Sequence, residues 1–206
     1  MAAPRRRVVI VVLAALAVAA GVLAAASRRD LFPKRFAEVE PGKVYRSGQL
    51  TPEAFRRVVE RHGIKTIIDL GSFEPGTRGE TRNARTAAAL GVRRVVGDLE
   101  GDGTGNPNWY VAALRVMLDP ASQPVLVHCG AGTERTGLTV ALYEKMTRGQ
   151  ALDEGLRRAC AHGHDPSRNP KLELVAREWG ERIEAAVRSG GWIEGVAPVT
   201  PAGAGR

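Results

Sequence analysis

The stretch from Pro124 to Gly137 constrains the fold of this chain more than any other part of the sequence. It begins with the apolar run PVLVH, which is typical of a buried strand. A glycine-rich turn follows, and then an apolar pattern of helical spacing from Thr136 to Thr147. In a strand, tight turn and helix start of this kind, backbone N–H groups and the helix dipole attract an anion. The sequence therefore predicts an anion-binding turn between a strand and a helix.

Two reactive side chains frame this turn. Cys129 opens it, and Arg135 closes it six residues later. The positive field that attracts an anion also stabilises a thiolate, so we expect a nucleophile at Cys129. The planar guanidinium of Arg135 matches two phosphate oxygens, and the glycines at 130 and 132 let the backbone approach an anion closely. A Walker motif is excluded because the lysine that it requires is missing.

Residues 128–137, HCGAGTERTG, resemble the His-Cys-x5-Arg-Ser/Thr-Gly signature of the cysteine-based protein tyrosine phosphatases. The short chain is similar to their atypical, plant-and-fungal-like dual-specificity branch and its bacterial relatives. Residues 45–49, YRSGQ, resemble the segment that opens the catalytic domain in that branch, where we expect a structural role for Arg46. The resemblance covers roughly residues 40–188. We expect an α/β domain whose central sheet of four or five mostly parallel strands is flanked by helices, and the resemblance implies no metal or cofactor.

The resemblance also implies a mechanism. The Cys129 thiolate attacks phosphorus while Arg135 and backbone N–H groups hold the phosphate oxygens, and water then hydrolyses the phosphocysteine. The hydroxyl of Thr136 is expected to hydrogen-bond the thiolate. His128 is expected to support the loop through hydrogen bonds, without acting as a general base. The substrate-binding residues are then Gly130, Ala131, Gly132, Thr133, Glu134 and Arg135.

The mechanism needs a carboxylic acid to protonate the leaving oxygen. In the family this acid is an aspartate on a loop about thirty residues before the cysteine. Here a glycine-rich stretch offers Asp102, 27 residues before Cys129, and Asp98, 31 residues before it. The glycine-rich setting favours Asp102 and the count favours Asp98, with Glu100 as a third possibility. We assign Asp102 and keep Asp98 as the alternative.

The substrate follows less directly from the sequence. Glu134 makes the rim of the loop less cationic than the lysine-bearing loops of inositide-directed relatives. This favours a phosphorylated protein, such as one bearing phosphotyrosine, or a small phosphomonoester. The alternatives are an inositol-phosphate phosphatase of the same mechanism and a phosphate-binding module without turnover. A rhodanese-like sulfurtransferase is disfavoured by the Arg135-Thr136-Gly137 ending.

The N-terminal 29 residues form a separate unit in this interpretation. Three arginines precede Val8–Ala26, nineteen uncharged residues that as a helix would span about 28 Å, close to the thickness of a bilayer core. We expect a membrane signal-anchor that places the catalytic domain outside the cytoplasm, in the periplasm or the extracellular space. The alternative is a signal peptide cleaved near Ala26, which would leave a secreted protein.

The remaining chain divides into a catalytic domain at residues 30–189 and a disordered tail at 190–206, rich in Gly, Pro and Ala. We expect an irregular linker over residues 27–40. The net charge is +8, but residues 1–29 hold five arginines and no acid, which leaves 8 − 5, or +3, on the rest. A net charge this small excludes a nucleic-acid-binding surface. Of the two cysteines, Cys160 is expected to be a small buried residue on a helix.

Overall fold

A five-stranded sheet forms the centre of the molecule in the computed structural model, which describes residues 3–201. The strands lie in the order β1-β2-β5-β3-β4. β1 is antiparallel to β2, and all other neighbours are parallel. The strands are β1 (Ala37–Glu40), β2 (Val44–Ser47), β3 (Thr66–Asp69), β4 (Arg93–Val96) and β5 (Val125–His128). The predicted α/β fold with a mostly parallel sheet is therefore confirmed.

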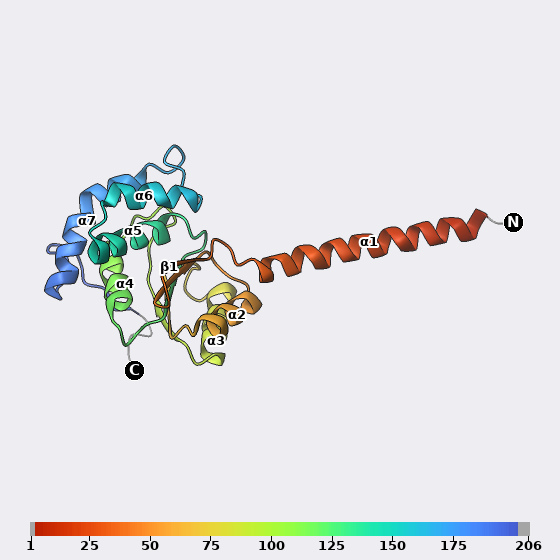
Figure 1. The fold of residues 1–206 in the computed structure, drawn as a ribbon, viewed down its shortest axis with the longest axis horizontal. Helices are drawn as coiled ribbons and strands as arrows, with labels where there is room; N and C mark the ends of the chain where they lie inside the picture. Colours follow the sequence, from red (N-terminus) through yellow and green to blue (C-terminus); the bar gives the residue numbers. More distant parts are fainter. Residues whose placement is uncertain (1–2, 202–206) are drawn as a thin grey trace.

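Helices cover both faces of this sheet (Figure 1). One face packs against α4, α5 and α7, and the opposite face packs against α2 and α3. α6 lies along α5. The helices are α1 (Ala3–Leu31), α2 (Pro52–His62), α3 (Arg78–Ala89), α4 (Asn108–Leu118), α5 (Glu134–Arg148), α6 (Leu152–Ala161) and α7 (Lys171–Ser189).

β5 is the central strand, and its side chains alternate between the two cores. Val125 and Val127 face the core shared with α4, α5 and α7, while Leu126 faces the core shared with α2 and α3. Continuing this alternation, Cys129 joins the first core. The period of two thus directs the thiol towards the α5 side of the sheet and the neighbouring His128 towards the opposite side.

The N-terminal helix differs from the sequence-based expectation. The uncharged run from Val8 to Ala26 is the middle of α1, a longer helix with charged residues at both ends that projects away from the body (Figure 1). Within the part of the chain that the structure describes, no helix combines the length and the apolar character needed to cross a membrane. This finding overturns the predicted membrane anchor and the predicted location outside the cytoplasm. The alternative cleavage site near Ala26 lies among residues whose side chains are outside the description.

Two other segments are more ordered than expected. β1 forms within the predicted linker because its backbone pairs with β2 after a turn at Pro41-Gly42. The segment after α7, expected to be disordered, packs onto α4 as far as residue 201 is described. Ile193 is buried and donates its N–H to Asn108 Oδ1 at 3.0 Å, while Asn108 Nδ2 donates to Ala197 O at 3.0 Å. Residues 202–206 of the predicted tail lie outside the described chain.

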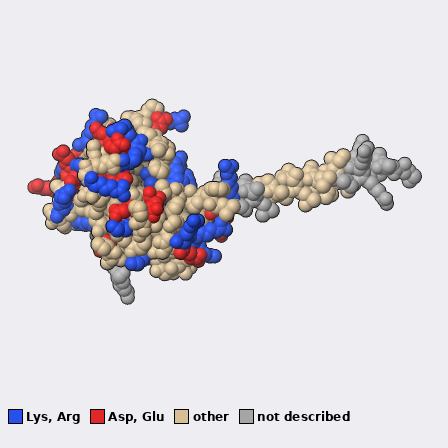
Figure 2. Space-filling view, viewed as in Figure 1, with Lys and Arg blue, Asp and Glu red and all other residues tan. Residues whose placement is uncertain are grey.

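Charged side chains of both signs are mixed over the body. Figure 2 shows Lys and Arg interspersed with Asp and Glu on the face in view, with uncharged side chains along the middle of α1 where its side chains are described, within residues 8–22. The face in view therefore carries a mixture of charges rather than a patch of one sign.

Candidate active site

The turn predicted around Cys129 is a loop of residues 129–135, here called the cysteine loop. It leaves the carboxyl end of β5, between β2 and β3, and enters the N-terminus of α5. Cys129 is buried, and the Gly132 N–H donates to its Sγ at 3.1 Å. A backbone donor on sulfur stabilises a thiolate there. The loop therefore places the Cys129 sulfur near the N-terminal, positive end of α5, where the sequence predicts an anion site.

Three cationic side chains hold the loop from outside by binding three successive carbonyl oxygens. Lys34 Nζ donates to Gly130 O at 3.0 Å, Arg35 Nη1 to Ala131 O at 2.9 Å, and Arg46 Nη2 to Gly132 O at 2.6 Å. Because these carbonyl oxygens point outward, the N–H groups of the same peptides are available to the interior of the loop.

Arg46 is the most buried of the three cations, with 3% of its surface exposed. Burial lowers the pKa of Arg46 to about 10, so the side chain remains charged at neutral pH. Its contact is with a backbone carbonyl of the loop, next to the thiol. Arg46 therefore supports the loop and adds positive potential to it.

A pair of glycines allows β2 and the cysteine loop to meet at this close distance. A Cβ added to Gly132 would lie 2.5 Å from Gly48 N, and one added to Gly48 would lie 2.5 Å from Ala131 O. Gly132 also has a φ of 79°, in the left-handed region that favours glycine. Any larger side chain at either position would push the loop away from β2.

Arg135 is buried, and its guanidinium is fixed from one side. Nη1 donates to Leu70 O at 3.2 Å, to Leu99 O at 3.0 Å and to Gly71 O, while Nη2 lies on the side of Gly130. A Cβ added to Gly71 would come within 3.1 Å of Arg135 Nη1. The glycine at position 71 thus makes room for the guanidinium.

Several buried polar atoms near the loop make no hydrogen bond with any residue that the structure describes. They include Ser47 Oγ, Thr136 Oγ1 and Arg135 Nε. The expected hydrogen bond from Thr136 to the thiolate is therefore not formed. Unpaired buried donors are costly, and an anion in the loop is the kind of ligand that would satisfy them.

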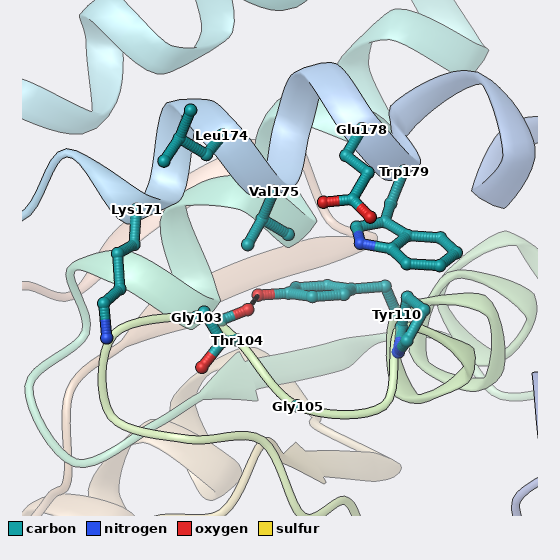
Figure 3. A pocket seen from close by; sticks show the side chains of 10 residues that line it. Gly103, Thr104, Gly105, Tyr110, Lys171, Leu174, Val175, Glu178 and Trp179 are labelled. Atoms are coloured by element: carbon teal, nitrogen blue, oxygen red, sulfur yellow. Dashed lines mark hydrogen bonds between the residues drawn. The ribbon is translucent and has the colours of Figure 1, made fainter.

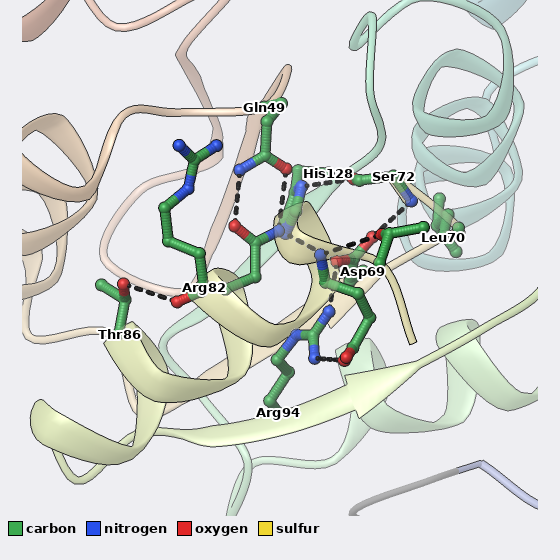
Figure 4. A network of polar contacts seen from close by, with 12 residues as sticks. Gln49, Asp69, Leu70, Ser72, Arg82, Thr86, Arg94 and His128 are labelled. Carbon is green, nitrogen blue, oxygen red and sulfur yellow. Dashed lines mark hydrogen bonds and ion pairs between the residues drawn. The ribbon is translucent and has the colours of Figure 1, made fainter. Parts of the chain in front are cut away.

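His128 belongs to a polar network on the opposite side of the sheet (Figure 4). Its Nδ1 lies 3.1 Å from Ser72 Oγ, and its Nε2 lies 3.9 Å from Asp69 Oδ2. Burial lowers the pKa of His128, so the ring is uncharged at neutral pH. The side chain faces away from Cys129 and contributes to the position of the loop rather than to proton transfer.

Asp69 is the buried centre of that network. Burial opposes its ionisation, but a protonated His128 and the hydrogen bonds from Arg94 and Ser72 together lower its pKa to about 2. Because His128 is uncharged at neutral pH, Arg94 carries the compensating charge there, with Nη2 at 2.8 Å from Asp69 Oδ2. Arg94 also binds Glu80 at 2.8 Å, which fixes α3 against β4.

Asp102, the predicted acid, lies in the glycine-rich loop of residues 97–107. Lys171 Nζ is 2.7 Å from its Oδ2, and Thr104 donates its N–H and Oγ1 to Oδ1 at 3.0 and 2.6 Å. Lys171 and Thr104 lower the pKa of Asp102 to about 2. The alternative, Asp98, is exposed on the same loop, as is Glu100. This loop reaches the site through Leu99 O, which accepts from Arg135.

A groove of about 400 Å³ separates the glycine-rich loop from α7 (Figure 3). Tyr110 forms its floor, and the Tyr110 hydroxyl donates to Gly103 O at 2.7 Å. Leu174 and Trp179 line the wall on α7, and Lys171 stands at one end. The loop that carries Asp102 is therefore flanked by an apolar space on the α7 side.

Cys160 is on α6 as predicted, but it is exposed rather than buried. His164, in the loop between α6 and α7, is buried against Glu134 of the cysteine loop. No group of three or more His, Cys, Asp or Glu side chains within residues 3–201 is arranged to hold a metal ion.

Comparison with known proteins identifies the family. The model of the family described as "DSP-PTPase phosphatase fused to NAD+ Kinase" matches residues 34–176. The inositol diphosphatase SIW14 of Saccharomyces cerevisiae is 30% identical over 114 residues, which cover 55% of this chain and 40% of that protein. The inositol diphosphatase DSP3 of Arabidopsis thaliana is 31% identical over 119 residues, which cover 55% of each. The chain thus spans about half of the length of these relatives.

Solved structures agree on the fold. The catalytic core of Siw14 superposes with a TM-score of 0.61 at 21% identity, over 77% of this chain and 93% of that one. A variant of P. aeruginosa TpbA in complex with pTyr superposes with a TM-score of 0.58 at 19% identity, over 77% and 98% of the two chains. At these identities the likeness establishes the architecture.

The Asp69–Arg94 pair makes a prediction for stability. Arg94→Met leaves a buried carboxylate without its cation, so we expect the free energy of unfolding to fall by about 3 kcal/mol at pH 7. A lowered pKa adds stability above the unfolded value near 4, and this stability is lost as pH falls towards 2. The loss should therefore be smaller at pH 3.

Urea denaturation at both pH values measures this difference. Arg82→Met, an exposed arginine on α3, is the matched control and should change stability by less than about 0.5 kcal/mol. An Arg94→Met loss that is equal at pH 7 and pH 3 contradicts the role of the Asp69 charge.

Proposed function

The chain belongs to the family of DSP-type protein tyrosine phosphatases described as fused to NAD+ kinase, and on this premise we propose that it hydrolyses phosphomonoesters through a phosphocysteine at Cys129. The observation that carries the proposal is the cysteine loop itself. A buried thiol accepts an N–H at 3.1 Å, and three cations turn three successive carbonyl oxygens outward. That arrangement suits a thiolate facing a phosphate whose oxygens bind backbone N–H groups.

In the first step the Cys129 thiolate attacks phosphorus in line, a sulfur–phosphorus bond forms, and the ester oxygen leaves with its electron pair. Arg135 and the N–H groups of the cysteine loop bind the other phosphate oxygens, and a carboxylic acid protonates the leaving oxygen. In the second step the same group, now a carboxylate, takes a proton from water, which attacks phosphorus and releases the thiolate. Thr136, whose Oγ1 has no described partner, is placed next in the chain to Arg135 and is proposed to donate to the departing thiolate.

Asp102 is the proposed general acid. Its loop is joined to Arg135 through Leu99 O, and a bridge between Leu99 and Gly105 closes the loop at its base. In the described arrangement the Asp102 carboxylate is paired with Lys171 and Thr104, so it must leave Lys171 before it can carry a proton. Because Lys171 is exposed, this pair is weak and can open readily.

Phosphotyrosine or a comparable phosphomonoester is the proposed substrate class. The variable side chains of the cysteine loop add no cation, and Glu134 adds an acid. Lys34, Arg35 and Arg46 lie beside the loop, but each donates to a backbone carbonyl. The second candidate is an inositol phosphate, because the two relatives at 30% and 31% identity are both named inositol diphosphatases.

Hydrolysis of p-nitrophenyl phosphate by the reduced protein tests the mechanism. We expect metal-independent turnover that Cys129→Ser abolishes, and Arg135→Lys should lower kcat/KM by at least about 100-fold because a lysine loses the two-pronged contact. Glu181→Gln, an exposed change on α7, is the control. A folded, reduced parent that binds inorganic phosphate in calorimetry without turnover would instead support the phosphate-binding module.

The general acid is identified by the leaving group. Asp102→Asn should lower kcat/KM about 100-fold for phenyl phosphate, and much less for p-nitrophenyl phosphate, whose leaving group needs little protonation. Asp98→Asn should change either rate by less than about two-fold. Because Lys171 lowers the pKa of Asp102, Lys171→Met should move the alkaline limb of the kcat profile to higher pH. A leaving-group-dependent loss in Asp98→Asn instead assigns the acid to Asp98.

The substrate class is tested by comparing the rates of hydrolysis of two substrates. We expect kcat/KM for a phosphotyrosyl peptide to exceed that for a diphosphoinositol phosphate by about ten-fold or more, because the variable side chains of the cysteine loop offer no cation to a second phosphate. Both rates are measured as phosphate release with one enzyme preparation, and Cys129→Ser supplies the background. A preference for the diphosphoinositol substrate would overturn this assignment and favour the inositol-phosphate alternative.

A further inference from the structure

His164 lies buried between two carboxylates that come from different helices. The residue is in the segment between α6 and α7, and its side chain has no exposed surface. Its Nδ1 is 2.5 Å from Glu134 Oε2, an ion-pair contact without the alignment of a hydrogen bond, and its Nε2 is hydrogen-bonded to Glu173 Oε1 at 2.8 Å. Glu134 is the first residue of α5 and Glu173 is in the first turn of α7. The imidazole therefore joins the cysteine loop to α7.

When His164 is neutral and both glutamates are ionised, the three side chains carry a single proton on a ring nitrogen. Two contacts between the ring and carboxylates call for one proton more. A neutral imidazole has a single N–H, so one of its nitrogens would face a carboxylate with a lone pair. A proton on the ring or on either carboxyl group would offset the repulsion between the two glutamates and make both contacts favourable. Burial raises the pKa of Glu134, which acts in the same direction. Asp165, the next residue, is turned towards Ser167 and Arg168 instead.

The position of Glu134 gives this proton a consequence for the site. Glu134 is the acidic side chain of the cysteine loop and directly precedes Arg135. An uncompensated carboxylate here would oppose the field of the α5 N-terminus and of Arg135 on an incoming phosphate. His164 meets this carboxylate and directs it towards α7.

We propose that His164 is a positioning residue that neutralises Glu134 and holds its carboxylate against α7, so that the cysteine loop keeps its affinity for a phosphate dianion. The proposal rests on the proposed function and adds to it a determinant of substrate affinity outside the signature motif. Protonation of the leaving group takes place on the separate glycine-rich loop. His164 therefore acts on the binding of the phosphate and leaves the rate of the chemical step nearly unchanged.

A double-mutant cycle on Glu134 and His164 tests the proposal with an aryl phosphate. His164→Gln should raise KM about ten-fold with kcat changed by less than about two-fold, because Glu134 regains its charge next to the bound phosphate. Glu134→Gln should lower KM, by up to about two-fold, because it removes the acidic side chain of the cysteine loop. The double variant should return KM to within about two-fold of the parent, and Glu181→Gln on α7 is the control.

Recovery of KM when Glu134→Gln is added to His164→Gln distinguishes charge compensation from packing. If His164 only fills space, the double variant remains as impaired as His164→Gln, and the proposal fails. If His164→Gln does not fold, Glu134→Gln is compared with the double variant, in which the loop carboxylate is absent. Equal KM values for these two proteins support the proposal, and a ten-fold difference overturns it.

Phosphate binding keeps this test separate from the proposed function. If the parent folds but has no turnover, the same four proteins are titrated with inorganic phosphate in a calorimeter. A weaker affinity in His164→Gln that is restored in the double variant supports the role of His164 even though the phosphatase proposal has failed. Equal phosphate affinity in all four proteins overturns it.

Discussion

The three cation-to-carbonyl contacts on the cysteine loop are the interactions on which the site depends. A loop of seven residues between a strand and a helix has many possible conformations, and only one of them turns successive N–H groups inward. Lys34, Arg35 and Arg46 select that conformation by binding the carbonyl oxygens of residues 130, 131 and 132 from outside. The close approach that these contacts require also explains the facing glycines at 48 and 132. The same three cations add positive potential around the position of the phosphate.

The segment from His164 to Glu173 has a second positioning role, because it contacts both the cysteine loop and the glycine-rich loop. His164 contacts Glu134 of the cysteine loop and is itself held by Glu173, while Asn169 and Lys171 bind Asp102 of the glycine-rich loop at 3.2 and 2.7 Å. The contacts differ in strength. The imidazole is fully buried, whereas Lys171 is mostly exposed and bound through one nitrogen. The cysteine loop is thus held by a buried contact, whereas the Asp102 carboxylate is held by an exposed ion pair that can open when its protonation changes.

Local patterns in the sequence predicted the parts of this architecture that local forces determine. The strand, turn and helix around Cys129 follow from an apolar run and a glycine-rich turn. The supporting contacts were not predicted, because they join residues far apart in the chain. Lys34 and Gly130 are 96 positions apart, and no periodicity links them. The order of residues 190–201 was missed for the same reason, since it depends on buried Asn108.

Glu134 shows why the charge of a site cannot be summed along a motif. In the sequence it makes the loop acidic, and that property favours monoesters over polyanions. In the structure the same carboxylate meets a buried imidazole thirty positions later, and burial raises its pKa. The charge that a substrate encounters near the cysteine therefore comes mainly from Arg135, the loop N–H groups and the outer cations. Discrimination between one phosphate and several must then depend on the rim, where Glu134 directs its carboxylate towards α7 and no loop side chain offers a further cation to a second phosphate.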